Sequence, residues 1–190
     1  MMRMELGKTL YVHERKAWRS WLSKNHDKEK EIWLIYYKKS SGKPRIPYND
    51  AVEEALCFGW IDSTVKKMDE EKFAQRFTPR GPRSGLSQAN RERIREMIPE
   101  GKMTKAGLAA VSHAFDAGKS EMFAIPKSIL NAIRKDRDAW KNFAKLPERY
   151  KRVRIAYLES RKRHGMGEFR RSLRHFIRMT AKNKRFGFVR

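Results

Sequence analysis

The chain of 190 residues is strongly basic, with 45 Lys and Arg against 22 Asp and Glu, which gives a formal net charge of +23 at pH 7. Hydrophobic residues make up 39% of the chain and include five Trp and ten Phe. This apolar content can fill a core, so the composition excludes a wholly disordered chain. The length suits one domain, and we expect residues 1–190 to form a single domain with one core. The excess of cations predicts an anionic partner.

Several classes of protein are excluded because their sequence signals are absent. No stretch of about 18 apolar residues could cross a bilayer, and residues 1–10 lack the pattern of a secretory signal, so we expect a cytoplasmic protein. A single cysteine, Cys57, fits a reducing compartment and excludes an intrachain disulfide. The five His show no metal-binding spacing, and no phosphate-binding loop of the GxxxxGK or GxGxxG type occurs. We therefore assign no catalytic residue, no cofactor and no metal site.

The first half of the chain predicts a small sheet with two helices. Apolar residues at helical spacing mark the helices, and runs of β-branched and aromatic residues mark the strands. In order, these elements are a helix at 14–24, a strand at 32–38, a short helix at 50–58 and strands at 60–67 and 72–78. Asn49 is expected to cap the short helix, and the MDEE sequence to form a hairpin turn. The side of the sheet that faces the core is expected to carry Trp33, Ile35, Phe73 and Phe77.

The second half of the chain predicts helices only, separated by Gly and Pro. In order, these helices lie at 88–98, at 105–117, from Pro126 onwards, at 136–145, at 147–163 and from Gly167 to about Lys182. Ser87 and Thr104 are expected to cap the first two. Together the elements predict an α+β fold, in which a small antiparallel sheet of about three strands packs with a mainly helical remainder.

Four short motifs follow one another in the middle of the chain. They are ALCFGWIDS at 55–63, RFTPR at 76–80, SGLSQAN at 84–90 and GKMTKAGLAAV at 101–111. In this order they resemble the successive blocks of the YdeI/OmpD-associated family, although Leu86 stands where that family usually has Trp. The family's label mentions bacteriocin protection and association with an outer-membrane porin. The resemblance implies the fold, and it brings no catalytic residue to this chain.

One candidate site lies in the loop between the last strand and the following helix. A helix that begins at Ser87 presents free backbone N–H groups and a partial positive charge, so arginines beside it would suit a phosphate or a carboxylate. The residues assigned to this anion site are Arg76, Arg80, Arg83, Ser84, Ser87 and Asn90, with Trp60 and Asp62 in the same pocket. In the alternative interpretation, the arginines pair with Asp62, Asp69 or Glu70 and Ser87 only caps the helix. Both interpretations stay open at this point.

A second candidate site lies in the C-terminal region, 149–190, which carries 15 Lys and Arg but only two acidic residues. At 100° per residue, the last helix has an apolar face formed by Phe169, Leu173, Phe176, Ile177 and Thr180. Its opposite face is expected to carry a ridge of basic residues, namely Arg171, Arg174, Arg178, Lys182 and Arg185. Such a ridge suits the phosphates of nucleic acid or an anionic membrane surface, and a solvated surface of cations is the alternative.

These observations favour a binding protein over an enzyme. We expect the basic C-terminal helices to engage a polyanion such as nucleic acid, without strong preference for sequence. The alternative is an enzyme or sensor that binds a small anionic ligand near the GWID and RFTPR motifs. The sequence carries no signal for the oligomeric state.

Overall fold

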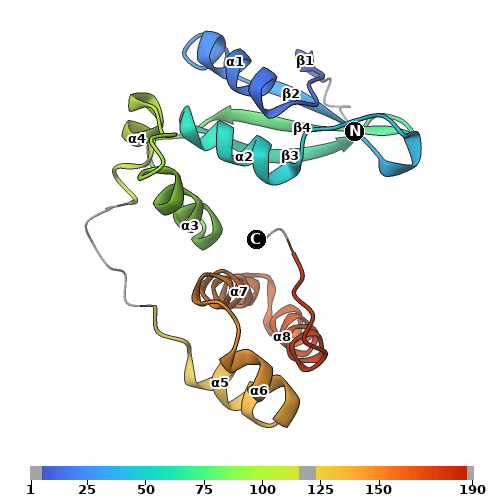
Figure 1. Ribbon diagram of the computed structural model, residues 1–190, viewed down its shortest axis with the longest axis vertical. Coiled ribbons are helices and arrows are strands. Elements are labelled where there is room, and N and C mark those ends of the chain that lie inside the picture. The colour runs from blue at the N-terminus through green and yellow to red at the C-terminus, as the bar shows by residue number, and fades with distance from the viewer. Residues whose placement is uncertain (1–5, 116–122, 188–190) are drawn as a thin grey trace. The chain divides into compact units, whose positions relative to one another are not determined.

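The computed structural model describes residues 6–115 and 123–187, and the chain divides into two compact units (Figure 1). The first unit is Met1–Leu86 with Arg93–Asp116, and the second is Ser87–Glu92 with Ala117–Arg190. Each unit has its own cluster of buried apolar residues, whereas one core was expected. The single domain stays a prediction, because compact units of one chain can unfold in one cooperative transition.

A mixed sheet of four strands is the framework of the first unit (Figure 1). Its strands are β1 (Thr9–Leu10), β2 (Ile32–Tyr37), β3 (Trp60–Lys67) and β4 (Lys72–Pro79), in the spatial order β1-β2-β4-β3. β4 pairs antiparallel with both of its neighbours, and β1 pairs parallel with β2. The α+β fold class is confirmed. The sheet has a fourth, parallel strand that was not expected, because the two residues of β1 are too few to show a strand periodicity.

A tight turn joins β3 to β4, and its geometry explains why the sequence predicted this hairpin well. The carboxylate of Asp69 accepts hydrogen bonds from the backbone N–H groups of Glu71 (2.8 Å) and Lys72 (2.9 Å). An aspartate that bonds the backbone two residues later is a common turn former. The expected strand at 60–67 is confirmed with the same bounds.

Two helices pack on one face of this sheet. They are α1 (Arg15–Asn25) and α2 (Tyr48–Cys57), and a short 3-10 turn, η1 (Lys39–Ser41), lies between β2 and α2. Trp18 of α1 is fully buried, and its indole N–H donates to the carbonyl of Ala51 in α2 (3.0 Å). The same ring meets Phe77 of β4 edge-on, with 5.4 Å between the ring centroids. Trp18 therefore joins both helices to the sheet.

The face of β2 that joins this core differs from the expected one. Its core residues are Ile32, Leu34 and Tyr36, whereas Trp33 and Ile35 had been placed there. Side chains of a strand alternate between the two faces, so an error of one residue exchanges the whole set. Trp33 is also buried, which explains why apolar character alone could not identify the core face.

The start of α2 also differs from the expected one. The residue before its first turn is Pro47, which makes no side-chain capping bond, and Asn49 lies inside the helix. The side chain of Asn49 instead accepts a hydrogen bond from Arg93 (2.7 Å). The expected cap at Asn49 was wrong, because the fixed backbone angle of a proline is already suited to a helix start.

The first unit also contains a helix, α4 (Lys105–Val111), that packs closely against the C-terminal end of α2. It follows α3 (Gln88–Met97), which contributes residues to both units. Thr104 caps α4 by accepting from the N–H of Gly107 (3.1 Å) and donates to the carbonyl of Cys57 (2.6 Å). A Cβ on Gly107 would lie 2.2 Å from that carbonyl oxygen, so only glycine allows this contact. This helix was expected to continue to Ala117, which lies outside the described residues, but it ends at Val111, and residues 112–115 are not helical.

The second unit consists of helices packed around their own core (Figure 1). They are α5 (Lys127–Arg134), α6 (Arg137–Ala144), α7 (Glu148–Arg161), the short 3-10 turn η2 (Lys162–His164) and α8 (Met166–Ala181). Asp136 caps α6 by accepting from the N–H of Ala139 (2.9 Å). The expected apolar face of α8 is confirmed, since its buried residues are Phe169, Phe176 and Thr180.

The last helix ends earlier than the expected basic ridge requires. Asn142 of α6 donates to the last two carbonyl groups of α8 (3.0 Å each), and Asn183 takes a left-handed backbone angle, φ 52°. A left-handed residue just past the last turn is a common helix stop. Lys182 is the C-terminal cap of the helix, close to the expected end, whereas Arg185 lies beyond it, and the expected place of Arg185 on the basic face was wrong.

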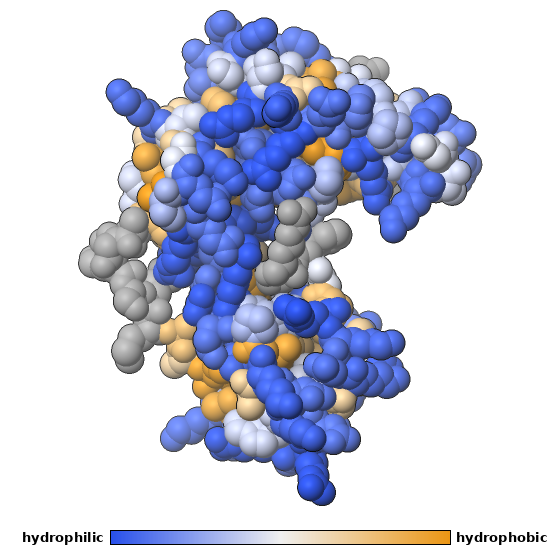
Figure 2. Space-filling model, viewed as in Figure 1, coloured by the Kyte–Doolittle hydropathy of each residue, from blue (hydrophilic) through white to orange (hydrophobic). Residues whose placement is uncertain are grey.

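The visible surface is mainly hydrophilic, with smaller hydrophobic areas on each unit (Figure 2). In the second unit the most exposed large hydrophobic residues are Trp140, Tyr157 and Met166. Among the described residues, no helix has both the length and the apolar character needed to cross a bilayer.

Candidate functional site

Arg76, the first residue assigned to the anion site, is bound by a carboxylate. Its guanidinium donates to Glu31 through Nε (2.7 Å) and through a terminal nitrogen. The indole of Trp33 donates to the same carboxylate (3.1 Å). These hydrogen bonds, chiefly the one from Arg76, lower the pKa of Glu31. An acidic partner was anticipated in the alternative interpretation, but at Asp62, Asp69 or Glu70 rather than at Glu31.

Trp60 and Asp62, assigned to the same pocket, have internal partners. Trp60 is 1% exposed, and its indole donates to the carbonyl of His26 (3.0 Å). Asp62 accepts from the hydroxyl of Tyr48 (2.9 Å) and from the amide of Gln75 (2.7 Å). Burial raises the pKa of Tyr48, and the negative charge of Asp62 raises it further. Tyr48 therefore stays protonated and serves as a donor to Asp62.

The remaining residues of this loop mostly organise the chain itself. Arg80 donates to the carbonyl groups of Ser84 (3.1 Å) and Gly85 (2.9 Å), and burial lowers the pKa of its guanidinium. Ser87 accepts from the N–H of Asn90 (3.3 Å), as a helix cap does. Arg83 is exposed. The structure thus brings Arg80 and Ser84 together and turns Arg76 towards β2. Anion binding by this loop stays a prediction.

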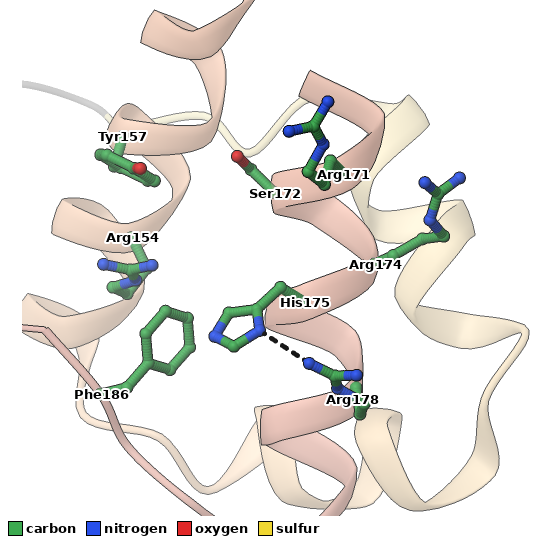
Figure 3. Close-up of a pocket in the computed structure, with 8 residues that line it drawn as sticks. All are labelled: Arg154, Tyr157, Arg171, Ser172, Arg174, His175, Arg178 and Phe186. Carbon is green, nitrogen blue, oxygen red and sulfur yellow. Dashed lines mark hydrogen bonds between the residues drawn. The ribbon is translucent and has the colours of Figure 1, made fainter. Parts of the chain in front are cut away.

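A cavity of about 750 Å³ opens in the second unit between α7 and α8 (Figure 3). Three of the residues predicted to bind a polyanion contribute to it, whereas Lys182 and Arg185 do not. The full lining is Arg154, Tyr157, Arg171, Ser172, Arg174, His175, Arg178 and Phe186. No carboxylate is among these residues, so the cavity favours an anion.

Arg154 is unusual among the residues of this lining because its charged side chain is buried. It is 8% exposed, and burial lowers the pKa of its guanidinium. The guanidinium lies over two aromatic rings, 4.0 Å from the ring centroid of Phe186 and 4.8 Å from that of Tyr157. Its Nε is buried without a hydrogen-bond partner, and no carboxylate of the described residues pairs with it. Cation–π contacts with these two rings are therefore the main interactions of the guanidinium.

The chain that follows α8 closes over Arg154. Phe186 is held by Tyr150, whose hydroxyl accepts from the Phe186 N–H (3.1 Å), and its ring meets His175 edge-on at 4.7 Å. The next residue, Gly187, has φ +84°, and a Cβ there would lie 2.9 Å from a terminal nitrogen of Arg154. Phe186 and Gly187, which follow α8, thus lie close against the guanidinium.

The arginines of α8 differ in their partners. Arg171 pairs with Glu168 (3.1 Å), which is also bound by Arg161 (2.9 Å), and this second bond is the main cause that lowers the pKa of Glu168. Arg178 instead donates to Nδ1 of His175 (3.1 Å). Because a guanidinium can only donate, Nδ1 is the acceptor and the imidazole proton lies on Nε2. Arg174 has no ion pair with any carboxylate of the described residues.

Sequence reasoning missed five residues of the cavity. They are Arg154, Tyr157, Ser172, His175 and Phe186. A partial signal exists, because Arg154 and Tyr157 are three residues apart on a helix and so share a face. The burial of Arg154 left no such signal, since it depends on Phe186, which is distant in the sequence.

Metal and thiol chemistry have no support in the described part of the chain. No group of three or more His, Cys, Asp or Glu side chains there could hold a metal ion. Cys57 is buried next to the sulfur of Met97 (3.7 Å), and burial raises the pKa of its thiol. A thiol that is protonated and covered is a poor nucleophile.

Comparisons with known proteins assign the two parts of the chain to two families. Residues 10–110 match the family described as "Domain of unknown function (DUF8412)", and residues 122–183 match the one described as "Bacteriocin-protection, YdeI or OmpD-Associated". No curated protein and no solved structure matches the chain. The family expected from the sequence is confirmed, although the four motifs that suggested it fall almost wholly within the other match. The second match spans α7 and α8, which form most of the cavity lining.

Proposed function

Since the chain belongs to the DUF8412 family of unknown function and also contains a YdeI/OmpD-associated segment, we propose that it is a non-enzymatic protein that binds nucleic acid through α8. Neither family description names a reaction or a ligand. The function must therefore be argued from the residues.

The observation that carries this proposal is the unpaired basic surface of α8. Arg174 and Arg178 are exposed, and no carboxylate of the described residues pairs with either of them. Arg174 extends from α8 on the side away from α7 (Figure 3). An exposed guanidinium without an acidic partner is ready to bind a phosphate oxygen and release a counterion.

The chemistry of this surface favours the backbone of nucleic acid over its bases. Guanidinium groups bind phosphate oxygens in any sequence, and such contacts fix position without reading bases. The aromatic rings beside this surface, Tyr157 and Phe186, are in contact with Arg154. Binding should accordingly be tight at low salt, weak at physiological salt and indifferent to sequence.

The test measures the anisotropy of a labelled duplex of random sequence across a salt series. Arg171, Arg174 and Arg178 are replaced together by Gln, which keeps helix propensity nearly unchanged. Each lost phosphate contact lowers the slope of log affinity against log salt by about 0.9, and Arg171 is already paired with Glu168, so we expect a fall of about 2.

The matched control removes three exposed cations from the first unit, with Lys24, Lys28 and Lys30 changed to Gln. It should leave the slope nearly unaltered. Equal loss in both triple variants would show diffuse attraction by net charge, and no binding by the unchanged protein at low salt would end the proposal.

A second candidate function is binding of a small anion at the RFTPR loop. Arg80 supports it, because its Nε is buried without a hydrogen-bond partner and only backbone carbonyls bind its terminal nitrogen. Arg76 supports it less, because Glu31 already neutralises its charge. The α8 surface has the stronger case, since Arg174 and Arg178 are exposed and pair with no carboxylate of the described residues.

A further inference from the structure

Arg154 is buried and its Nε has no hydrogen-bond partner, which costs free energy that the contacts of the second unit offset only in part. Removing a cation from water is unfavourable unless an acceptor or an opposite charge replaces the lost solvent. Stacking on aromatic rings returns only about 0.5–2 kcal/mol. Arg154 has two such rings but no hydrogen-bond acceptor among the described residues. A residue kept in this state is suited to an anion that arrives from outside.

The side chains around Arg154 line a hollow that is partly open to solvent. Ser172 and His175 project from α8 towards α7, and Tyr157 and Phe186 flank the guanidinium (Figure 3). A volume of about 750 Å³ is within the usual range for small-ligand sites. The space therefore exceeds what one phosphate needs and can also admit the organic group that carries it.

The set of donors fits a phosphate monoester better than a carboxylate. A phosphate monoester carries a charge of about −1.5 to −2 at pH 7 and offers three strong acceptor oxygens. Arg154 can supply two terminal nitrogens, Ser172 a hydroxyl and Arg178 a second positive charge. A carboxylate has a single charge and two oxygens, so it would leave part of this set unused.

We propose that the cavity between α7 and α8 binds a phosphate monoester, with Arg154 as its buried cation and Ser172 and Arg178 as further ligands. This goes beyond the proposed function, because a duplex backbone can contact the outer face of α8, where Arg174 extends away from α7, without entering the space beside Arg154 (Figure 3). The phosphate monoester can belong to a small metabolite or to the end of a nucleic acid strand, and the chemistry that recognises it is the same.

The test titrates the full chain by calorimetry with inorganic phosphate, adenosine monophosphate and two short single strands that differ only in a 5′-phosphate. Ionic strength is held constant with chloride. We expect adenosine monophosphate to bind, and the phosphorylated strand to bind more tightly than the 5′-hydroxyl strand. Tighter binding of the phosphorylated strand than of the 5′-hydroxyl strand assigns the site to nucleic acid ends, and binding of the mononucleotide without any gain from the 5′-phosphate assigns it to small molecules.

Two variants locate the binding. Arg154→Met keeps a long apolar side chain between the two rings and should weaken monophosphate binding at least about tenfold, the loss expected for charge-assisted hydrogen bonds. Arg170→Met removes the same charge from an exposed position of α8 outside the cavity lining and should change the affinity less than about threefold. If Arg154→Met does not fold, Ser172→Ala serves as a second variant, and we expect it to weaken monophosphate binding to a smaller extent.

The outcomes separate this proposal from the proposed function. If Arg154→Met loses monophosphate binding but keeps its salt-dependent duplex binding, the cavity and the outer face of α8 are distinct sites. If neither inorganic phosphate nor adenosine monophosphate binds the unchanged protein, and the 5′-phosphate adds no affinity to the strand, the proposal is wrong even where duplex binds. If Arg80→Gln abolishes phosphate binding while Arg154→Met does not, the site lies at the RFTPR loop, and the proposal is equally wrong.

Discussion

Two arginines of the first unit, Arg15 and Arg19, have surroundings unlike those of two arginines of the second unit, Arg154 and Arg178. In the first unit Arg15 and Arg19 both bind Glu54, a carboxylate that is only 3% exposed, at 2.5 and 2.6 Å. In the second unit Arg154 and Arg178 lie against aromatic rings and an imidazole, without any carboxylate of the described residues.

This difference shows that net charge is a poor guide to a binding site. A buried cation beside a buried carboxylate is satisfied by the fold and has little left for a ligand. A buried cation without one keeps its capacity to bind an anion. The anion site predicted from Arg76 counted charges along the sequence. Arg154 of α7 and Arg174 and Arg178 of α8 differ from Arg76 because no carboxylate of the described residues pairs with them.

The largest expected effect is a loss of stability when the apolar core of either unit is disrupted. Phe77 of the first unit and Phe176 of the second are both fully buried, so changing either to Ala should cost about 3–5 kcal/mol of stability. Denaturant unfolding followed by circular dichroism and by Trp fluorescence checks both variants. In a single domain, one transition exists and both changes shift it.

Two transitions, each shifted by only one of the variants, would contradict the single domain predicted from the sequence. An unchanged midpoint for Phe77→Ala would instead show that the packing of Phe77 against Trp18 contributes little. The number of transitions shows whether the two units share one free energy of unfolding or have separate ones. The effect of a charge substitution can then be compared between the units.

A smaller effect is expected where the first unit pairs its charges. Glu54→Gln keeps the shape of the side chain but leaves Arg15 and Arg19 without their shared negative charge, and we expect a loss of about 1–3 kcal/mol. Thermal and urea unfolding measure it. Glu70→Gln is the control, since Glu70 pairs with Lys67 on the open surface, where such pairs contribute about 0–1 kcal/mol. Equal effects in the two variants would contradict the role given to Glu54.

The sequence predicted elements well where the signal was local. The hairpin of β3 and β4 followed from strand-forming runs on either side of a turn that Asp69 closes by itself. It predicted the face of β2 wrongly, because the run IWLIYY is apolar on both faces and only tertiary packing distinguishes them. The family was recognised, but no local pattern revealed the division into two cores.

Candidate sites were predicted less well, because partners that are distant in the sequence decide them. Arg76 is engaged by Glu31, 45 residues earlier, and α8 ends at Ala181 because Asn142 of another helix bonds its last carbonyls. Charge periodicity identified Arg174 and Arg178 correctly as exposed residues of α8. It could not find Arg154, because arginine in a helix is usually a surface residue.

A still smaller effect on stability than that of Glu54→Gln is expected from Arg154→Met. Methionine loses the stacking on Tyr157 and Phe186 but also removes a buried charge that lacks a carboxylate, so the two contributions nearly cancel. We expect a stability within about 1 kcal/mol of the unchanged protein, or above it, in urea unfolding without phosphate. Arg170→Met should likewise stay within about 0.5 kcal/mol, as surface substitutions usually do. Added phosphate should then stabilise the unchanged protein and not Arg154→Met, because a ligand that binds only the folded state raises its stability. A loss above about 2 kcal/mol in the absence of phosphate would show that the second unit needs this guanidinium for its own packing, and the contrast between paired and unpaired arginines would no longer hold.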